Sequence, residues 1–203
     1  MLDGIMRKVI DRPLNRAGRL LAARGWTADA VTLAGLGLGL VAALVLALGG
    51  PGGLALVPLL ASRAADGLDG AIARATQKTD FGGYLDITAD FLFYGAIPLA
   101  FALRDPAQAV AAAFLLCSFY VNGASFLGYA ILAEKHGLQS VARGEKSLYF
   151  TSGLLEGTET IGFFVFLCLW PEVFNGAAFA FGSLCFVTAG SRVMLARRVF
   201  GET

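Results

Sequence analysis

Four aspartates in two closely spaced pairs are the residues of this sequence best suited to chemistry. Asp66 and Asp69 are three positions apart, and Asp86 and Asp90 are four positions apart. At about 100° per residue, each pair lies on one face of a helix. The connection between the two stretches is short, so the two helices should be antiparallel neighbours whose carboxylates converge. Such a cluster repels itself strongly unless cations neutralise it.

Hard divalent cations are the expected partners of these carboxylates, and we predict Mg²⁺ or Mn²⁺, with two ions bound. Two ions bridged by carboxylates suit phosphoryl chemistry, because they stabilise both the attacking and the leaving oxygen. Gly70 and Ala73 leave the same helix face open to a bulky ligand, and Arg74 can bind a phosphate bidentately. The alternative is a set of salt bridges that only orients the helices. Arg63 and Arg74 alone cannot balance four aspartates.

The composition predicts a membrane protein. Of the 203 residues, 57% are hydrophobic and 15% are charged, whereas about a quarter of the residues of a soluble domain are charged. Residues 30–49 contain no charge, which matches the roughly 20 apolar residues that one span requires. We predict an all-α integral membrane protein with six transmembrane helices, at roughly Ala30–Leu48, Leu54–Arg74, Gly82–Leu103, Ala107–Ala133, Tyr149–Leu169 and Phe174–Leu195.

The N-terminal stretch has a different character. Residues 1–26 alternate apolar and basic positions at helical spacing, which predicts an amphipathic cytoplasmic juxtamembrane helix that lies on the lipid surface. Residues 27–203 then form the six-helix transmembrane catalytic domain.

Basic residues decide the expected orientation. Twelve of them fall on one side of the six predicted spans and only Arg104 on the other, so both termini and the aspartates should be cytoplasmic. The net charge is +1, which suggests no nucleic-acid partner.

The residues around the aspartates resemble the signature of the CDP-alcohol phosphotransferase (CDP-alcohol phosphatidyltransferase) family, D-x-x-D-G-x-x-A-R followed by G-x-x-x-D-x-x-x-D. The spacer, residues 75–81, is one residue shorter than is usual in the family. Thr27 to Thr32 is similar to the family's T-P-N-x-x-T, with Ala28 and Asp29 in place of Pro and Asn. Every fixed position of the signature is filled, by Asp66, Asp69, Gly70, Ala73, Arg74, Gly82, Asp86 and Asp90.

The resemblance implies a reaction and a role for each residue. An alcohol attacks the phosphorus distal to cytidine in a CDP-linked donor, CDP-diacylglycerol or another CDP-alcohol, and CMP leaves. Asp66, Asp69 and Asp86 hold metal and diphosphate, and Asp90 shares in metal binding and acts as general base. The implied CDP-binding residues are Asp66, Asp69, Gly70, Ala73, Arg74 and Gly82. The resemblance also implies a homodimer in a bacterial inner (plasma) membrane.

The acceptor alcohol is less constrained by the sequence. Arg143, Lys146 and Arg192 favour an anionic acceptor such as a phosphorylated alcohol, although the first two also fit the excess of positive charge on the cytoplasmic side. Glu156 and Glu159 within an apolar stretch need cationic partners, either arginines of the bundle or an amine-bearing acceptor. All five are candidate acceptor-binding residues.

Three further interpretations stay open at this point. In the first, the roles of the two substrates are exchanged, so that diacylglycerol is the acceptor and a soluble CDP-alcohol is the donor. A transporter or channel also uses acidic residues within the membrane, although inverted repeats do not stand out here. An inactive scaffold is the third, and the complete set of aspartates argues against it.

Overall fold

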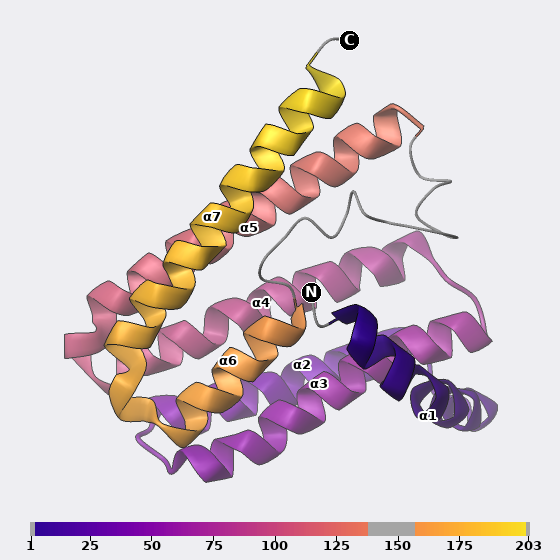
Figure 1. Ribbon diagram of the computed structural model, residues 1–203. Coiled ribbons are helices and arrows are strands. Elements are labelled where there is room, and N and C mark those ends of the chain that lie inside the picture. The colour runs from indigo at the N-terminus through magenta and orange to yellow at the C-terminus, as the bar shows by residue number, and fades with distance from the viewer. Residues whose placement is uncertain (1–2, 138–156, 202–203) are drawn as a thin grey trace.

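The structure is a computed structural model that describes residues 3–137 and 157–201, and side chains from residue 10 onward. Throughout these residues the secondary structure is helical, as the sequence predicts (Figure 1). The elements in order are α1 (Asp3–Ala23), α2 (Ala28–Ala47), α3 (Gly52–Ala75), α4 (Asp80–Arg104), the 3₁₀ turn η1 (Pro106–Gln108), α5 (Ala109–Lys135), α6 (Gly157–Leu169), the 3₁₀ turn η3 (Pro171–Val173) and α7 (Phe174–Phe200).

Four helical stretches are long and apolar enough to cross a membrane: α2, α4, η1 with α5, and η3 with α7. Their positions agree with four of the six predicted spans. The other two predicted spans coincide with helices of different character. α3 is long enough but carries charged residues in its C-terminal half, and the described part of α6 has 13 residues. Residues 149–156 of the fifth predicted span lie outside the described part of the chain.

Local signals in the sequence account for the helix boundaries. Thr27 caps α2, because its hydroxyl oxygen accepts a hydrogen bond from the Ala30 N–H at 3.2 Å, and Thr79 caps α4 through the Gly82 N–H at 3.0 Å. Gly25 and Gly49 end α1 and α2 with φ of 85° and 76°, a conformation that favours glycine. The Arg104 guanidinium donates to the Gly50 carbonyl at 3.0 Å and so links the C-terminal end of α4 to the turn after α2.

The helices form two groups in Figure 1. α2, α3, α4 and α6 lie side by side, and α3 contacts both α2 and α6. α5 and α7 pair with each other, and α5 also contacts α4. The turns after α2, α4 and α6 gather at one end of the bundle, whereas the α3–α4 turn and α1 lie at the other (Figure 1).

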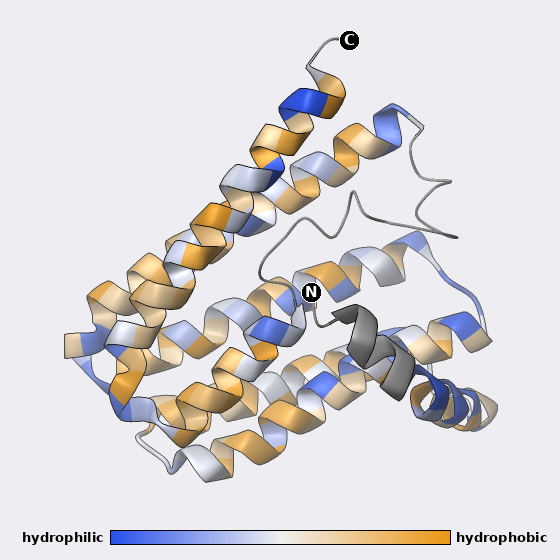
Figure 2. Ribbon diagram, viewed as in Figure 1, coloured by the Kyte–Doolittle hydropathy of each residue, from blue (hydrophilic) through white to orange (hydrophobic). Residues whose placement is uncertain are grey.

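A core of large side chains joins the two groups. Phe93 and Phe101 of α4, Phe164 of α6 and Phe174 of α7 are fully buried, and the rings of Phe101 and Phe174 stack with centroids 4.3 Å apart. Outside this core the helices expose many large apolar side chains, and Figure 2 shows hydrophobic residues along most of the α5–α7 pair. Such a surface is suited to lipid rather than to water.

α1 packs closely against α3, on the half of α3 that carries the aspartates. A Cβ added to Gly18 would lie 2.6 Å from Ala71 Cβ and 2.8 Å from the Ala71 carbonyl carbon. On the other helix, a Cβ at Gly67 would lie 2.9 Å from Leu14 Cδ1. Glycine on both helices therefore sets the distance between α1 and α3, as in other close helix contacts within membranes.

This contact predicts that Gly18→Ala destabilises the protein although alanine favours helix by about 1 kcal/mol. The added methyl group meets backbone of α3, which cannot rotate away, so α1 has to shift. Thermal unfolding of the detergent-purified protein measures the effect, and the midpoint should fall by several degrees. Gly37→Ala is the matched control, because a Cβ there meets nothing within 4 Å. An equal midpoint for the two variants would contradict the tight contact.

Candidate active site

Two antiparallel helices bring the predicted site together. α3 carries Asp66 and Asp69 in its C-terminal half, and α4 carries Asp86 and Asp90 in its N-terminal half. The sequence predicts that α3 and α4 are direct neighbours, because only four residues join them. Instead, α2 packs against both helices, and the aspartate side chains of α3 and α4 meet beside α2, in the halves of these helices next to the α3–α4 turn. This turn lies at the end of the bundle that carries α1 (Figure 1).

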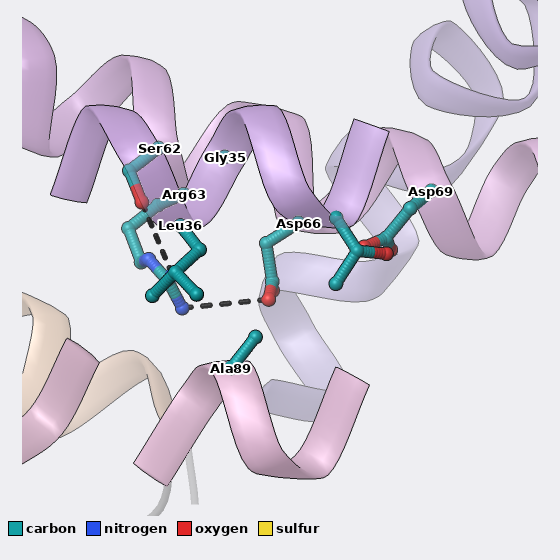
Figure 3. A pocket seen from close by; sticks show the side chains of 8 residues that line it. Gly35, Leu36, Ser62, Arg63, Asp66, Asp69 and Ala89 are labelled. Atoms are coloured by element: carbon teal, nitrogen blue, oxygen red, sulfur yellow. Dashed lines mark hydrogen bonds and ion pairs between the residues drawn. The ribbon is translucent and has the colours of Figure 1, made fainter. Parts of the chain in front are cut away.

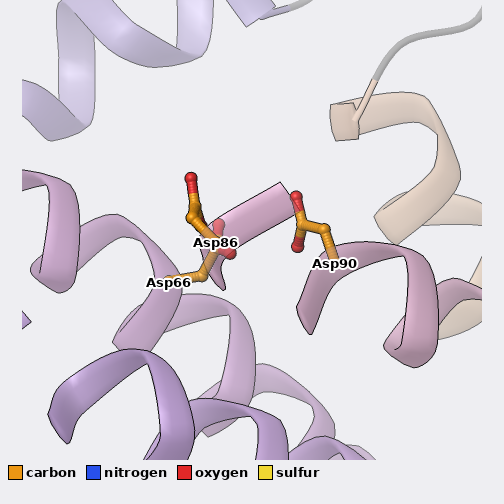
Figure 4. A group of neighbouring side chains, drawn as sticks. All are labelled: Asp66, Asp86 and Asp90. Carbon is orange, nitrogen blue, oxygen red and sulfur yellow. The ribbon is translucent and has the colours of Figure 1, made fainter. Parts of the chain in front are cut away.

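Three of the four aspartates form a compact group. One carboxylate oxygen from each of Asp66, Asp86 and Asp90 lies within 4.8 Å of the others, and all three side chains are partly buried (Figure 4). Across one magnesium ion, oxygen ligands lie at most about 4.2 Å apart, twice the metal–oxygen distance. The spacing and the all-oxygen donor set therefore fit a hard divalent cation, with small side-chain adjustments.

Asp69 lies outside this group of three. Its side chain is 5% exposed, and its Oδ2 accepts a hydrogen bond of 2.6 Å from the Thr32 hydroxyl of α2. The same Thr32 oxygen lies 3.1 Å from the Ala28 carbonyl oxygen of its own helix. The sequence predicts convergence of all four carboxylates, whereas the structure brings three together and turns the fourth toward α2. A metal-binding role for Asp69 stays a prediction.

Among the described residues, Arg63 is the cation that contacts the cluster. Its Nη1 donates to Asp90 Oδ1 at 2.7 Å and to Asp66 Oδ1 at 3.4 Å, and its Nη2 donates to Ser62 Oγ at 3.2 Å. Figure 3 shows Arg63 and Asp66 facing each other across a small cavity of about 10 Å³ between α2, α3 and α4. One guanidinium balances one carboxylate, so among the residues that the structure describes the cluster keeps an excess of negative charge, which favours a bound cation.

Arg74, the other arginine that the sequence places near the aspartates, faces α1. Its Nε and Nη2 donate to Asn15 Oδ1 at 3.1 and 3.0 Å. A Cβ at Gly70 would lie 3.2 Å from Arg74 Nη1, so glycine leaves the guanidinium room to fold back along its own helix. The predicted CDP-binding face therefore borders α1.

Gly82 and Ala73 complete the predicted CDP-binding set. A Cβ at Gly82 would lie 2.9 Å from Thr79 Oγ1 and 3.2 Å from Asp29 Oδ1. The N-terminal ends of α2 and α4 are thus close together, and Asp29, which replaces the usual asparagine, lies at this end of the site. Ala73 is half-buried, two residues before the end of α3.

The candidate acceptor residues are only partly described. Arg143, Lys146 and Glu156 lie outside the described residues, and Glu159 is half-buried in the first turn of α6. Arg192 of α7 binds α5: its Nη1 donates to the Asn122 carbonyl and Oδ1, each at 3.0 Å, and to Ser125 Oγ at 2.7 Å. Asn122 and Ser125 therefore link α5 to α7.

Two residues that contact the site, Asn15 and Thr32, were not assigned to it from the sequence. Asn15 holds Arg74, and Thr32 holds Asp69. Thr32 is the last residue of the Thr27–Thr32 motif, and this motif could have indicated a role for Thr32 in the site. Asn15 had no such signal, because a single amide on a basic helix resembles any other polar surface residue.

A comparison with known families decides what this site is. The model of the CDP-alcohol phosphatidyltransferase family matches residues 26–189. The chain belongs to this family. The resemblance seen at the aspartates thus extends over most of the sequence, and the protein is a transferase of the CDP-alcohol phosphatidyltransferase type, not a transporter or channel.

Relatives and a solved structure agree with this assignment. The inner membrane protein YnjF of Escherichia coli is 45% identical over 194 residues, which cover 95% of this chain and 94% of that protein. Archaetidylinositol phosphate synthase of Pyrococcus horikoshii is 40% identical over 104 residues, about half of each chain. The crystal structure of Mycobacterium tuberculosis phosphatidylinositol phosphate synthase with CDP-DAG bound shares the fold, with a TM-score of 0.68 over 92% of this chain and 94% of that one, at 21% identity.

The three-carboxylate group predicts measurable metal binding by this phosphatidyltransferase. Asp66→Asn or Asp86→Asn removes one anionic ligand and should weaken Mn²⁺ binding by more than about tenfold, because losing even an outer-shell partner of a metal site costs about 10–100-fold. Electron paramagnetic resonance of free Mn²⁺ measures the affinity. Asp80→Asn, an exposed aspartate of the first turn of α4, should bind Mn²⁺ as the wild type does. Equally weakened Mn²⁺ binding in all three variants would mean that Mn²⁺ is attracted by the overall negative charge and not by this group of carboxylates.

Proposed function

We propose that the protein transfers a phosphatidyl group from CDP-diacylglycerol to an alcohol, releases CMP, and so contributes to phospholipid synthesis. The observation that carries the proposal is the meeting of Asp66, Asp86 and Asp90 at one end of apolar helices. There a lipid-linked donor and a water-soluble alcohol can both reach one group of carboxylates. The CDP-DAG in the M. tuberculosis structure of the same fold supports this donor.

The chemistry assigns one role to each group. The acceptor hydroxyl attacks the phosphorus distal to cytidine, the bond from that phosphorus to the bridging oxygen breaks, and CMP leaves with that oxygen. Asp90 takes the proton of the attacking hydroxyl. Bound Mg²⁺ or Mn²⁺, two ions in our proposal, would be held by the four aspartates and would supply charge stabilisation to the phosphoryl oxygens. Asp69 has one oxygen on Thr32, which leaves its other oxygen for this task.

The CDP moiety is proposed to lie along the face of α3 formed by Gly70, Ala73 and Arg74, with Gly82 at the start of α4. Arg74 presents a guanidinium that is already oriented by Asn15. An arginine held in advance loses less side-chain freedom when it binds a diphosphate. The absence of a side chain at Gly70 and Gly82 allows the diphosphate to approach the backbone.

The same proposal places the molecule in the membrane. α3 and α6 complete six spans, the amphipathic helix of residues 1–26 lies on the cytoplasmic surface, and residues 27–203 form the catalytic domain. The end of the bundle that carries α1 and the aspartates faces the cytoplasm, because most basic residues of the sequence fall on this side of the predicted spans. The protein is proposed to act as a homodimer in the inner membrane.

For the acceptor we propose an anionic, phosphorylated alcohol. Arg192 supports this, since its guanidinium is held by Asn122 and Ser125 on the α5–α7 pair. Two relatives named as synthases of inositol phosphate lipids make a phosphorylated acceptor chemically reasonable. Glu159, at the start of α6, is proposed to contact a hydroxyl or amine of the same acceptor.

The decisive experiment measures metal-dependent CMP release by the purified protein from CDP-diacylglycerol. The wild type should release CMP when an acceptor is present and stop when the metal is chelated. Asp90→Asn should lose transfer by at least about 100-fold, in the range of general-base contributions, and still bind CDP-diacylglycerol. Full activity of Asp90→Asn would refute the base assignment. Release only from a soluble CDP-alcohol with diacylglycerol would reverse the substrate roles, and no release from either donor would indicate an inactive scaffold.

The acceptor proposal is tested with the same assay and a panel of alcohols. Phosphorylated alcohols such as glycerol 3-phosphate or inositol phosphate should support CMP release better than their unphosphorylated forms. Arg192→Met should raise the KM for the active acceptor by about tenfold or more, the cost of one charge-assisted contact, and leave the KM for CDP-diacylglycerol unchanged. Arg198→Met, an exposed arginine of the same helix, is the control. Preference for an uncharged or amine-bearing alcohol would overturn the proposal.

A further inference from the structure

Arg63 is a charged residue that the family signature does not contain. It lies one helical turn before Asp66 in α3, and its side chain is only 9% exposed. A buried charge in an apolar bundle is costly unless it is paired. Arg63 is paired, by the hydrogen bonds to Asp90 and Asp66. Its position is therefore tied to the reaction centre rather than to the surface of the bundle.

The surroundings hold the guanidinium in one place. Arg63 Cζ lies 3.9 Å from the centroid of the Phe93 ring, a cation–π contact, and Nη2 donates to the buried Ser62 hydroxyl. Gly39 of α2 makes room for both partners, since a Cβ there would lie 2.5 Å from Phe93 Cδ2 and 3.0 Å from Ser62 Oγ. Three helices thus fix this cation, which distinguishes it from a flexible surface arginine.

The hydrogen bonds of Arg63 hold its positive charge between Asp90 and Asp66. Arg63 Nη1 lies 2.7 Å from Asp90 Oδ1, so it orients the carboxylate that is proposed as the base. The longer contact of 3.4 Å with Asp66 puts the same positive charge beside a metal ligand. A positive charge this close to the carboxylates reduces their attraction for a divalent cation.

We propose that Arg63 is a positioning residue of the transfer reaction, a fixed cation that orients Asp90 and lowers the affinity of the aspartate group for divalent metal. The first part rests on the proposed function, and the second does not. The two effects have opposite signs when Arg63 is removed. An arginine that only stabilised the fold would instead lower activity, metal affinity and thermal stability together.

The test compares Mn²⁺ affinity, CMP release and thermal unfolding of purified Arg63→Met with those of the wild type. Methionine keeps most of the length of the side chain and removes its charge. Mn²⁺ should bind about tenfold more tightly, because the repulsion from the guanidinium is gone. At saturating metal, kcat should fall by about tenfold or more, because the base is no longer oriented. Arg104→Met, which removes an arginine at the opposite end of α4, should change neither quantity.

Two further variants separate charge from orientation. Arg63→Lys keeps the charge but not the fork between Asp90 and Asp66, so Mn²⁺ affinity should stay near the wild-type value while kcat falls. Phe93→Leu removes the ring beneath the guanidinium and should also lower kcat while Mn²⁺ affinity stays near the wild-type value. This variant keeps the orienting role testable if Arg63→Met does not fold.

Unchanged or weaker Mn²⁺ binding by Arg63→Met would overturn the proposal, as would wild-type kcat in all three variants. If the wild type releases no CMP, the proposed function fails while the metal-affinity measurement still decides whether Arg63 opposes metal binding.

Discussion

Negative charge inside an apolar helical bundle is the constraint on which this structure depends. Asp66, Asp86 and Asp90 occupy one small volume, and carboxylates this close together repel one another unless positive charge lies nearby. Arg63 supplies a part of that charge and is itself fixed by Phe93 and Ser62. In the proposed mechanism the remaining excess of negative charge would attract divalent cations, and these would bind the diphosphate of the donor. Substrate binding would then follow from a charge imbalance that the fold maintains.

The three helices around this charge contribute in different ways. α3 and α4 provide the carboxylates, and α2 provides the groups behind them: Thr32 binds Asp69, and Gly39 admits the Phe93 ring. The carboxylates and Arg63 lie at one end of the bundle, while the opposite end packs through stacked aromatic rings such as Phe101 and Phe174, with the Arg104–Gly50 hydrogen bond beside them. The charged cluster and the aromatic core are therefore built from different stretches of the same helices.

The sequence was sufficient for the features that depend on local spacing. Helix positions followed from uncharged runs, and the convergence of three aspartate side chains from α3 and α4 followed from their spacing and the short connection between these helices. Contacts between residues distant in sequence could not be read in the same way. Asp69 faces Thr32, 37 positions away, and Arg74 faces Asn15, 59 positions away, because helix rotation and packing, not periodicity, choose these partners. The number of spans is also not decided by apolarity alone, since α3, which the sequence predicts as a span, carries charged residues that set it apart from the four apolar stretches.

The contact between Gly18 and Ala71 means that α1 cannot be replaced independently of α3. A surface helix that served only as a membrane anchor would be an interchangeable module, replaceable by any amphipathic sequence of equal length. Here the backbones of α1 and α3 touch, and Asn15 reaches the arginine beside the signature aspartates. The N-terminal helix has thus become inseparable from the catalytic one. A chimaera that exchanges it between family members has to carry Leu14, Asn15 and Gly18 along with their partners on α3.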